Sequence, residues 1–200
     1  MVQRAFRLPS QALRLLLAAA VGGCASTPAG PIWTPLEDPP LQAYAQALAC
    51  RVAPRCGEHP VLLVDLPGTQ AEALPDGRIA IRRGMLLALE EEAELAFVIA
   101  HEIAHRRLGH RAPQSLQARL PLELAADAHA LEQLRRLGYP DDAPARLIER
   151  IRPSRADDER HRIAHQQIDA RLAALPPATG REAAASAEFE GLLQRYRSER

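Results

Sequence analysis

The chain has 200 residues, of which 47% are hydrophobic and 25% charged, a composition typical of globular proteins that bury a core. The 25 basic and 25 acidic residues leave no net charge, which argues against a nucleic-acid-binding protein. We therefore expect one globular domain behind the N-terminal segments, and no nucleic-acid partner.

Residues 1–23 resemble a bacterial lipoprotein signal peptide. Arginines precede an apolar run at 15–21, which is too short to span a bilayer because spanning takes about 20 residues. The sequence Val-Gly-Gly-Cys at 21–24 resembles a lipobox, which implies cleavage before Cys24 and lipid attachment to its sulfur. The alternative is an ordinary secretory signal with an incidental cysteine. The lipobox reading predicts a protein that is held on a bacterial membrane and faces the periplasm; Ala25 after the cysteine favours the outer membrane.

Residues 24–40 are rich in proline and predict an extended tether, so the domain is expected to cover residues 41–200. Cys50 and Cys56 belong to an exported chain, where oxidising conditions favour a disulfide between them. Two free thiols are the alternative.

The domain begins with a predicted helix at 41–49, where apolar residues recur on one face. Apolar runs at 61–64 and 78–81 flank turn signals and predict two strands of a small β-meander. A short helix is predicted at 84–89, followed by a longer one at 91–108. The fold class is therefore α+β and mainly helical.

Four more helices are predicted at 121–137, 143–151, 157–175 and 181–196. Pro121 is expected in the first turn of its helix, where a missing amide hydrogen costs nothing. The last helix carries an apolar stripe formed by Phe189, Leu192, Leu193 and Tyr196, and such a stripe is expected to pack against the core.

The sequence His-Glu-Ile-Ala-His at 101–105 carries the strongest functional signal. His101 and His105 are four residues apart, so a helix places both imidazoles on one face, where they can bind one Zn²⁺. Glu102 lies beside the first histidine and can act as the general base on a water in metal-assisted peptide hydrolysis. The alternative is a buried histidine pair with a purely structural role, but three ionisable groups in so apolar a helix are costly unless paired or metal-bound.

A third metal ligand is expected because catalytic zinc usually takes three protein ligands and one water. We assign it to Glu123, with His110 or His129 as the next candidates. Asp127 follows Glu123 by one helical turn, so it can hydrogen-bond a ligand histidine. The alternative for this pair is an ordinary solvated helix face.

Several motifs between residues 65 and 147 together resemble the zinc metallopeptidase family that includes HtpX and the CAAX prenyl endopeptidase. The segment at 73–81, the HExxH motif with Gly109-His110, the acidic pair at 123 and 127 and the Gly-Tyr-Pro turn at 138–140 follow in the family's order. The resemblance implies a zincin-like domain of the gluzincin type, one Zn²⁺ per subunit and peptidase activity, in a short periplasmic lipoprotein.

The chain departs from this family at several positions. Ala125 replaces an acidic residue, and the short link between the two motif helices implies a compact version with a more open cleft. The family's C-terminal basic residue, which is thought to stabilise the tetrahedral intermediate, has three candidates here, namely Arg160, His161 and Arg162.

These patterns together predict a zinc-dependent metalloendopeptidase that cleaves unfolded or damaged envelope proteins, with the substrate extended along the strand edge at 79–81. A non-proteolytic zinc lipoprotein that assists outer-membrane protein assembly is the alternative. A metal-sequestering lipoprotein is disfavoured because the sequence has no histidine-rich tract.

Overall fold

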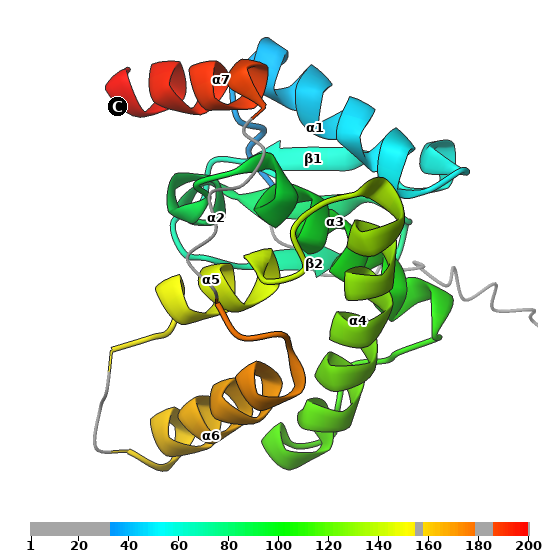
Figure 1. The fold of residues 1–200 in the computed structure, drawn as a ribbon, viewed down its shortest axis with the longest axis vertical. Coiled ribbons are helices and arrows are strands. Elements are labelled where there is room, and N and C mark those ends of the chain that lie inside the picture. The colour runs from blue at the N-terminus through cyan, green and yellow to red at the C-terminus, as the bar shows by residue number, and fades with distance from the viewer. Residues whose placement is uncertain (1–32, 155–157, 179–185, 200) are drawn as a thin grey trace, which may run out of the picture. The chain divides into compact units, whose positions relative to one another are not determined.

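The computed structural model describes residues 33–154, 158–178 and 186–199. Every described residue belongs to one compact unit, which begins at residue 33. The predicted signal peptide, Cys24 and Ala25 therefore lie outside the described residues. Figure 1 shows the described unit as a small β-sheet surrounded by helices.

The elements follow one another in the order α1 (Pro39–Val52), η1 (Cys56–Glu58), β1 (Val61–Val64), β2 (Ala71–Ala73), β3 (Ile79–Arg82), α2 (Arg83–Ala88), α3 (Glu92–Arg107), α4 (Leu116–Leu137), α5 (Ala143–Arg150), α6 (Glu159–Ala174) and α7 (Ala187–Ser198). This order confirms the coarse prediction of a mainly helical α+β fold. Within the described residues, none of the helices has the length and apolar character needed to span a membrane.

The three strands are arranged as β1-β3-β2, which is not the predicted meander. Strand β3 lies in the centre, parallel to β1 and antiparallel to β2. The prediction was wrong because β2, with its short Ala-Glu-Ala sequence, gives no apolar signal, although it forms a hairpin with β3. The central position explains why Ile79, Ala80 and Ile81 are all fully buried.

The outer edge of β1 is covered by side chains of α1. The Gln42 amide donates to the Val61 carbonyl at 2.8 Å and accepts from the Leu63 amide at 3.0 Å. The Gln46 side chain accepts from the Val61 amide at 2.8 Å. Farther along the strand, the Leu36 amide donates to the Leu63 carbonyl. These bonds satisfy the edge of β1, so β2 is the open edge of the sheet.

Residues 33–38 belong to the folded unit, although the sequence assigned them to the tether. Pro35 forms a β-bridge with Val64, and Leu36 is buried. Asp38 caps α1 by accepting from the Leu41 amide, and it binds the guanidinium of Arg195 on α7. The sequence analysis did not predict these contacts, because their partners lie far along the chain and the segment itself is rich in proline.

Helix α4 begins five residues earlier than predicted. Ser115 caps it by accepting from the Ala118 amide, and Pro121 lies inside the helix rather than at its start. The proline has no amide hydrogen, so the helix loses the hydrogen bond that residue 121 would donate to the Gln117 carbonyl. At the other end, Gly138 adopts the left-handed conformation with φ 77° and stops the helix, as predicted.

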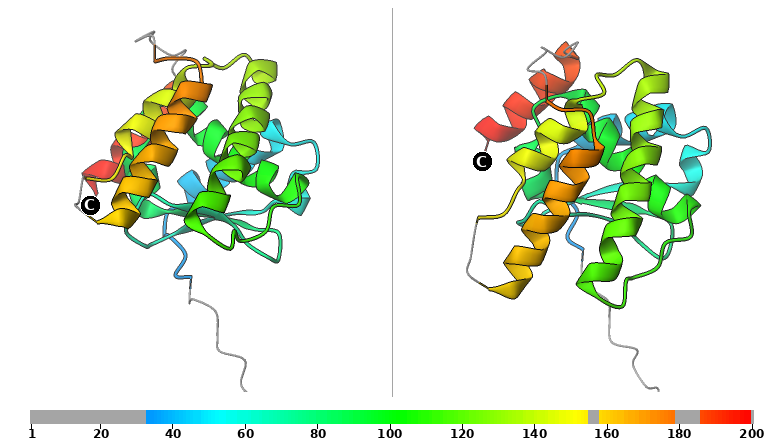
Figure 2. Two further views of the ribbon diagram at one scale, coloured as in Figure 1. Left: turned by 90° about the horizontal axis from the view of Figure 1, so that it is seen from below. Right: turned by 60° about the horizontal axis from the view of Figure 1, so that its bottom comes forward.

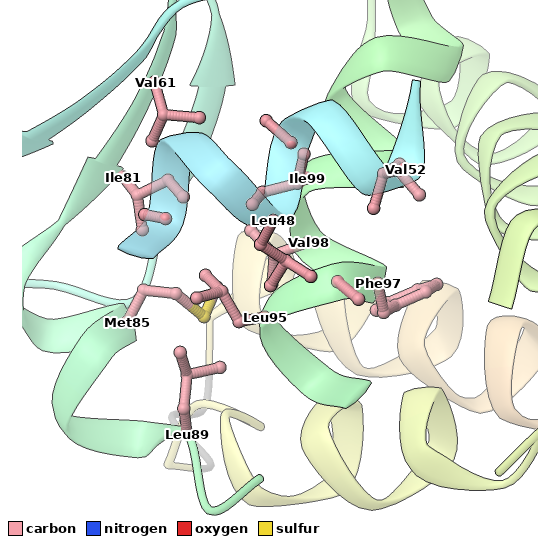
Figure 3. Close-up of a cluster of buried hydrophobic side chains, with 14 of the residues drawn as sticks. Leu48, Val52, Val61, Ile81, Met85, Leu89, Leu95, Phe97, Val98 and Ile99 are labelled. Atoms are coloured by element: carbon pink, nitrogen blue, oxygen red, sulfur yellow. The ribbon is translucent and has the colours of Figure 1, made fainter. Parts of the chain in front are cut away.

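Helix α3 runs through the middle of the core. Its residues from Glu92 to Ala104 are all buried, and α1, the sheet, α4 and α5 pack around it. Figure 3 shows how side chains from α1, the strands, the α2 region and α3 meet in one apolar cluster. The stripe on α7 is also part of this core, because Phe189, Leu193 and Tyr196 are buried.

A disulfide joins Cys50 at the end of α1 to Cys56 in η1, which confirms the predicted pairing. The bridge closes the short loop that leads into β1 and fixes η1 against α1. Helix α6 lies beside α4 and α5 on the side of the molecule remote from α1 (Figure 2). Together with α3, α4 and α5, it surrounds the residues of the candidate site.

Candidate metal centre and cleft

Helix α3 carries both motif histidines on one face. His101 and His105 are one turn apart, and their Nε2 atoms lie 3.0 Å from each other. The preceding residues 93–100 are almost all apolar and anchor the helix in the core, so the histidines have little freedom to move. His101 is buried, whereas His105 is partly exposed.

Glu123 on α4 completes a three-residue group. Its Oε2 lies 3.3 Å from Nε2 of His101, and its Oε1 lies 4.0 Å from Nε2 of His105. One ligand atom from each of the three residues lies within 4.8 Å of the other two, and no other such group occurs in the described parts of the chain. The structure thus brings together the three predicted ligands; His110 and His129 lie outside the group.

This donor set fits a zinc ion. Ligands at about 2.0–2.1 Å from a tetrahedral metal lie about 3.3 Å from one another, close to the distances between these three residues. Two imidazoles and one carboxylate are also the ligands of many catalytic zinc sites, which keep one position free.

Asp127 orients the first histidine, as predicted. Its Oδ1 lies 2.9 Å from Nδ1 of His101, so the opposite ring nitrogen faces the ligand group. Burial lowers the pKa of His101, but hydrogen bonds to Asp127 and Glu123 outweigh it and raise the pKa to about 9. A metal ion would have to replace this proton, because only neutral imidazole is a ligand.

His110 contacts the second ligand from the loop after α3. Its Nδ1 lies 2.9 Å from Nδ1 of His105, and its backbone amide donates to the His105 carbonyl. Gly109, with φ 67°, makes the turn that brings His110 back. Burial and the neighbouring charge of His101 lower the pKa of His105 to about 4, so His105 is held in the neutral form that binds metal.

Arg171 on α6 is a site residue that the sequence analysis missed. Its guanidinium donates two hydrogen bonds of 2.7 Å to the carboxylate of Asp127 and lies 3.3 Å from Glu123. Burial raises the pKa of Asp127, but hydrogen bonds from His101 and Arg171 outweigh it and lower the pKa. A buried carboxylate needs a cationic partner, so Asp127 implied a nearby basic side chain, but the sequence does not show which one.

The three predicted C-terminal candidates lie elsewhere. Arg160 and Arg162 are exposed on α6, and His161 bonds to Asp158 at the start of that helix. None of the three lines the cleft described below. They occupy the first turn of α6, whereas Arg171 lies near its other end.

A cleft of about 930 Å³ opens beside the ligand group. Its walls come from the segment 69–75 with β2, from α3, from the loop and first turns of α4, and from α5 and α6. The exposed strand edge is therefore β2, not the predicted edge at 79–81, because β3 is covered on both sides.

Glu102 faces this cleft one residue after the first histidine and is 8% exposed. Burial raises the pKa of its carboxyl group, and the positive charge of His101 opposes that rise. A raised pKa suits a group that must accept a proton and then release it near neutral pH.

Comparison with known proteins assigns the chain to a family. A search of curated proteins finds no match. The model of peptidase family M48 matches residues 35–136, which are more than half of the chain and run from the start of the folded unit to the last turn of α4. This stretch contains the HExxH motif and Glu123, and the chain therefore belongs to peptidase family M48.

Proposed function

We propose that the protein is a zinc-dependent metalloendopeptidase that cleaves unfolded or damaged proteins of the cell envelope, as a short lipoprotein relative of HtpX. The observation that carries this proposal is the convergence of His101, His105 and Glu123 beside Glu102 in an open cleft. A structural zinc site would need neither the cleft nor a buried carboxyl group that lies next to the ligands without belonging to them.

The chemistry divides between the metal and the protein. Zinc bound by His101, His105 and Glu123 would supply Lewis-acid chemistry. Glu102 takes the proton from the attacking water and later delivers it to the leaving amine. Asp127 and Arg171 hold the ligands, since Arg171 is committed to the carboxylates of Asp127 and Glu123.

The substrate is proposed to extend along β2 by strand addition. The Arg82 amide donates to the Gln70 carbonyl, and the Leu74 amide donates to the Arg78 carbonyl. In an antiparallel pair only every second residue of a strand forms such bonds, so Ala71 and Ala73 do not bond to β3 through their backbone groups. The backbone groups of Ala71 and Ala73 therefore point away from β3, along the wall of the cleft, where the Ala73 amide donates to Glu102. Only an extended segment can use such an edge, which favours unfolded or mobile chains over folded proteins.

The substitution Glu102→Gln tests the enzyme proposal, with casein digestion and zinc content measured on the same preparation. We expect full zinc occupancy, an unchanged fold and no proteolysis. Glu132→Gln is the control, because Glu132 is an exposed carboxylate on α4 that bonds to Arg136. Proteolysis by a clean Glu102→Gln preparation would refute the mechanism.

We further propose that a lipid on Cys24 anchors the mature protein to the outer membrane, facing the periplasm. The lipobox and the basic, apolar segment before it support this proposal. The variant Cys24→Ser should appear in the soluble periplasmic fraction and retain peptidase activity. Membrane retention of this variant, with no uptake of a palmitate analogue by the wild type, would contradict the anchor.

A further inference from the structure

We propose that Arg106 is a positioning residue that fixes the β2–β3 hairpin against α3, so that the β2 edge is ready to receive an extended substrate beside Glu102. This inference rests on the proposed peptidase function with its strand addition, and it names the residue that holds the edge in place. Arg106 follows the ligand His105 directly, at the end of α3, and it lines the cleft.

One guanidinium nitrogen of Arg106 joins α3 to two other segments of the chain. Its Nη1 donates to the Gly77 carbonyl in the turn between β2 and β3, and to the Glu58 carbonyl in η1 at 2.9 Å. The same nitrogen lies 3.5 Å from Nδ1 of His59. Hydrogen bonds from a charged donor are stronger than those between neutral groups. An exposed arginine thus connects the end of the motif helix with the hairpin turn and with η1.

The hairpin turn has room for Arg106 because residue 77 is a glycine. A Cβ at Gly77 would lie 2.6 Å from Nη1 of Arg106. Two backbone bonds close the turn, from the Gly77 amide to the Leu74 carbonyl at 3.0 Å and from the Leu74 amide to the Arg78 carbonyl at 2.8 Å. Leu74 and Pro75 follow β2 directly and line the cleft. Holding the turn therefore also holds the end of the β2 edge.

A second attachment to α3 fixes the direction of the hairpin. The Ala73 amide donates to the Glu102 carboxylate. Glu102 and Arg106 are four residues apart, so they lie on the same face of α3, about 6 Å apart along the helix. A hairpin held at Glu102 alone could pivot about that point, whereas two attachments keep β2 at one angle to the helix. The edge then presents its backbone groups at a constant position relative to Glu102.

The segment on the other side of Arg106 is itself fixed. Glu58 ends η1, and the disulfide between Cys50 and Cys56 attaches the start of η1 to the end of α1. The Glu58 amide also donates to the Arg55 carbonyl at 2.9 Å. Arg106 therefore lies between a cross-linked segment and the hairpin turn. An edge ordered in this way before binding does not lose conformational freedom when the substrate arrives, which favours tight binding.

The test uses the zinc-loaded protein and two quenched fluorescent peptides with the same central sequence, one of eight residues and one of four. Only the longer peptide has enough backbone groups to pair along β2 while it occupies the site. We expect Arg106→Met to raise KM for the longer peptide about tenfold, because the edge must then be ordered during binding. Its kcat, kcat/KM for the shorter peptide and the zinc affinity should stay unchanged.

Two further variants distinguish positioning from a general structural role. Arg107→Met is the matched control, because Arg107 is exposed, does not line the cleft and makes no hydrogen bond or salt bridge with the residues that the structure describes. Arg106→Lys should restore most of the affinity, since one nitrogen makes both bonds and an ammonium group has enough hydrogens for them. Arg106→Gln replaces Arg106→Met if that variant does not fold.

The outcomes separate this inference from the peptidase proposal. Equal losses for the two peptides, or equal losses in Arg106→Met and Arg107→Met, would overturn the positioning role and leave the peptidase standing. An unchanged KM for the longer peptide would do the same. Failure of the wild type to cleave either peptide would contradict the proposed function itself. Fluorescence anisotropy of the longer peptide on Glu102→Gln, with and without Arg106→Met, would then still decide whether Arg106 supports binding.

Discussion

Glu123 and Asp127 lie one turn apart on α4 but have different tasks. Glu123 belongs to the ligand group, whereas Asp127 reaches it through Nδ1 of His101. We expect Glu123→Ala to lower zinc affinity more than Asp127→Ala, which should cost about 10–100-fold. Competition with a chromophoric chelator measures both. Normal zinc binding by Glu123→Ala would show that the third ligand is another residue.

Arg171 holds the Asp127 carboxylate through two parallel hydrogen bonds. Lysine keeps the charge but cannot form this planar pair, so Arg171→Lys should lower kcat/KM about tenfold or more. Arg162→Lys is the control on the same helix, because Arg162 is exposed and does not line the cleft. Equal activity of the two variants would mean that the guanidinium geometry is unimportant.

The ligand residues could be predicted from sequence, but Arg171 could not. His101 and His105 are fixed by helical spacing. Glu123 was preferred over His110 and His129 as the third ligand, and the packing of α4 against α3 brings it to the two histidines. Arg171 reaches Asp127 from a helix 44 residues away, and several arginines on α6 are equivalent in sequence. Only the packing of α6 against α4 distinguishes them.

Among the elements, helices were predicted better than the sheet. Helices such as α3 and α5 depend on spacing within the element, and their predicted ranges differ from the structure by only one residue. The strand order β1-β3-β2 depends on pairing between segments that are distant in sequence, and local sequence patterns do not predict such pairing. The position of the cleft edge was therefore assigned to the wrong strand.

The turn of the β2–β3 hairpin depends on a glycine. Gly77 has φ 102°, and a Cβ there would lie 2.6 Å from the Arg106 guanidinium and 3.1 Å from the Glu58 carbonyl oxygen. We expect Gly77→Ala to lower the free energy of unfolding by more than about 1 kcal/mol. Urea denaturation measures this change.

For Gly191 we expect the opposite change in the free energy of unfolding. Gly191 lies within α7, and a Cβ there would meet nothing within 4 Å. Gly191→Ala should raise the free energy of unfolding by about 0.5–1 kcal/mol, because alanine favours the helix. A higher unfolding midpoint for Gly77→Ala would contradict the backbone argument for Gly77, and a lower midpoint for Gly191→Ala would contradict the helix argument for Gly191.

At the scale of the whole molecule, the core and the site share one helix. Residues from α1, the sheet, α4 and α5 pack around α3, and the same helix presents His101, Glu102 and His105 to the cleft. Folding therefore assembles the ligands, and substitutions in this core should affect stability and zinc affinity together.

The glutamines that cover β1 also bear on how the protein behaves when it is concentrated. A sheet with two open edges can add copies of itself in a row, whereas a sheet with one open edge stops after a single addition. We expect the double variant Gln42→Leu and Gln46→Leu to uncover the β1 amides and carbonyls that these side chains now bond. Light scattering should then show concentration-dependent assembly that the wild type lacks; a monodisperse variant would mean that the helix itself, rather than its two amide side chains, keeps neighbouring molecules apart.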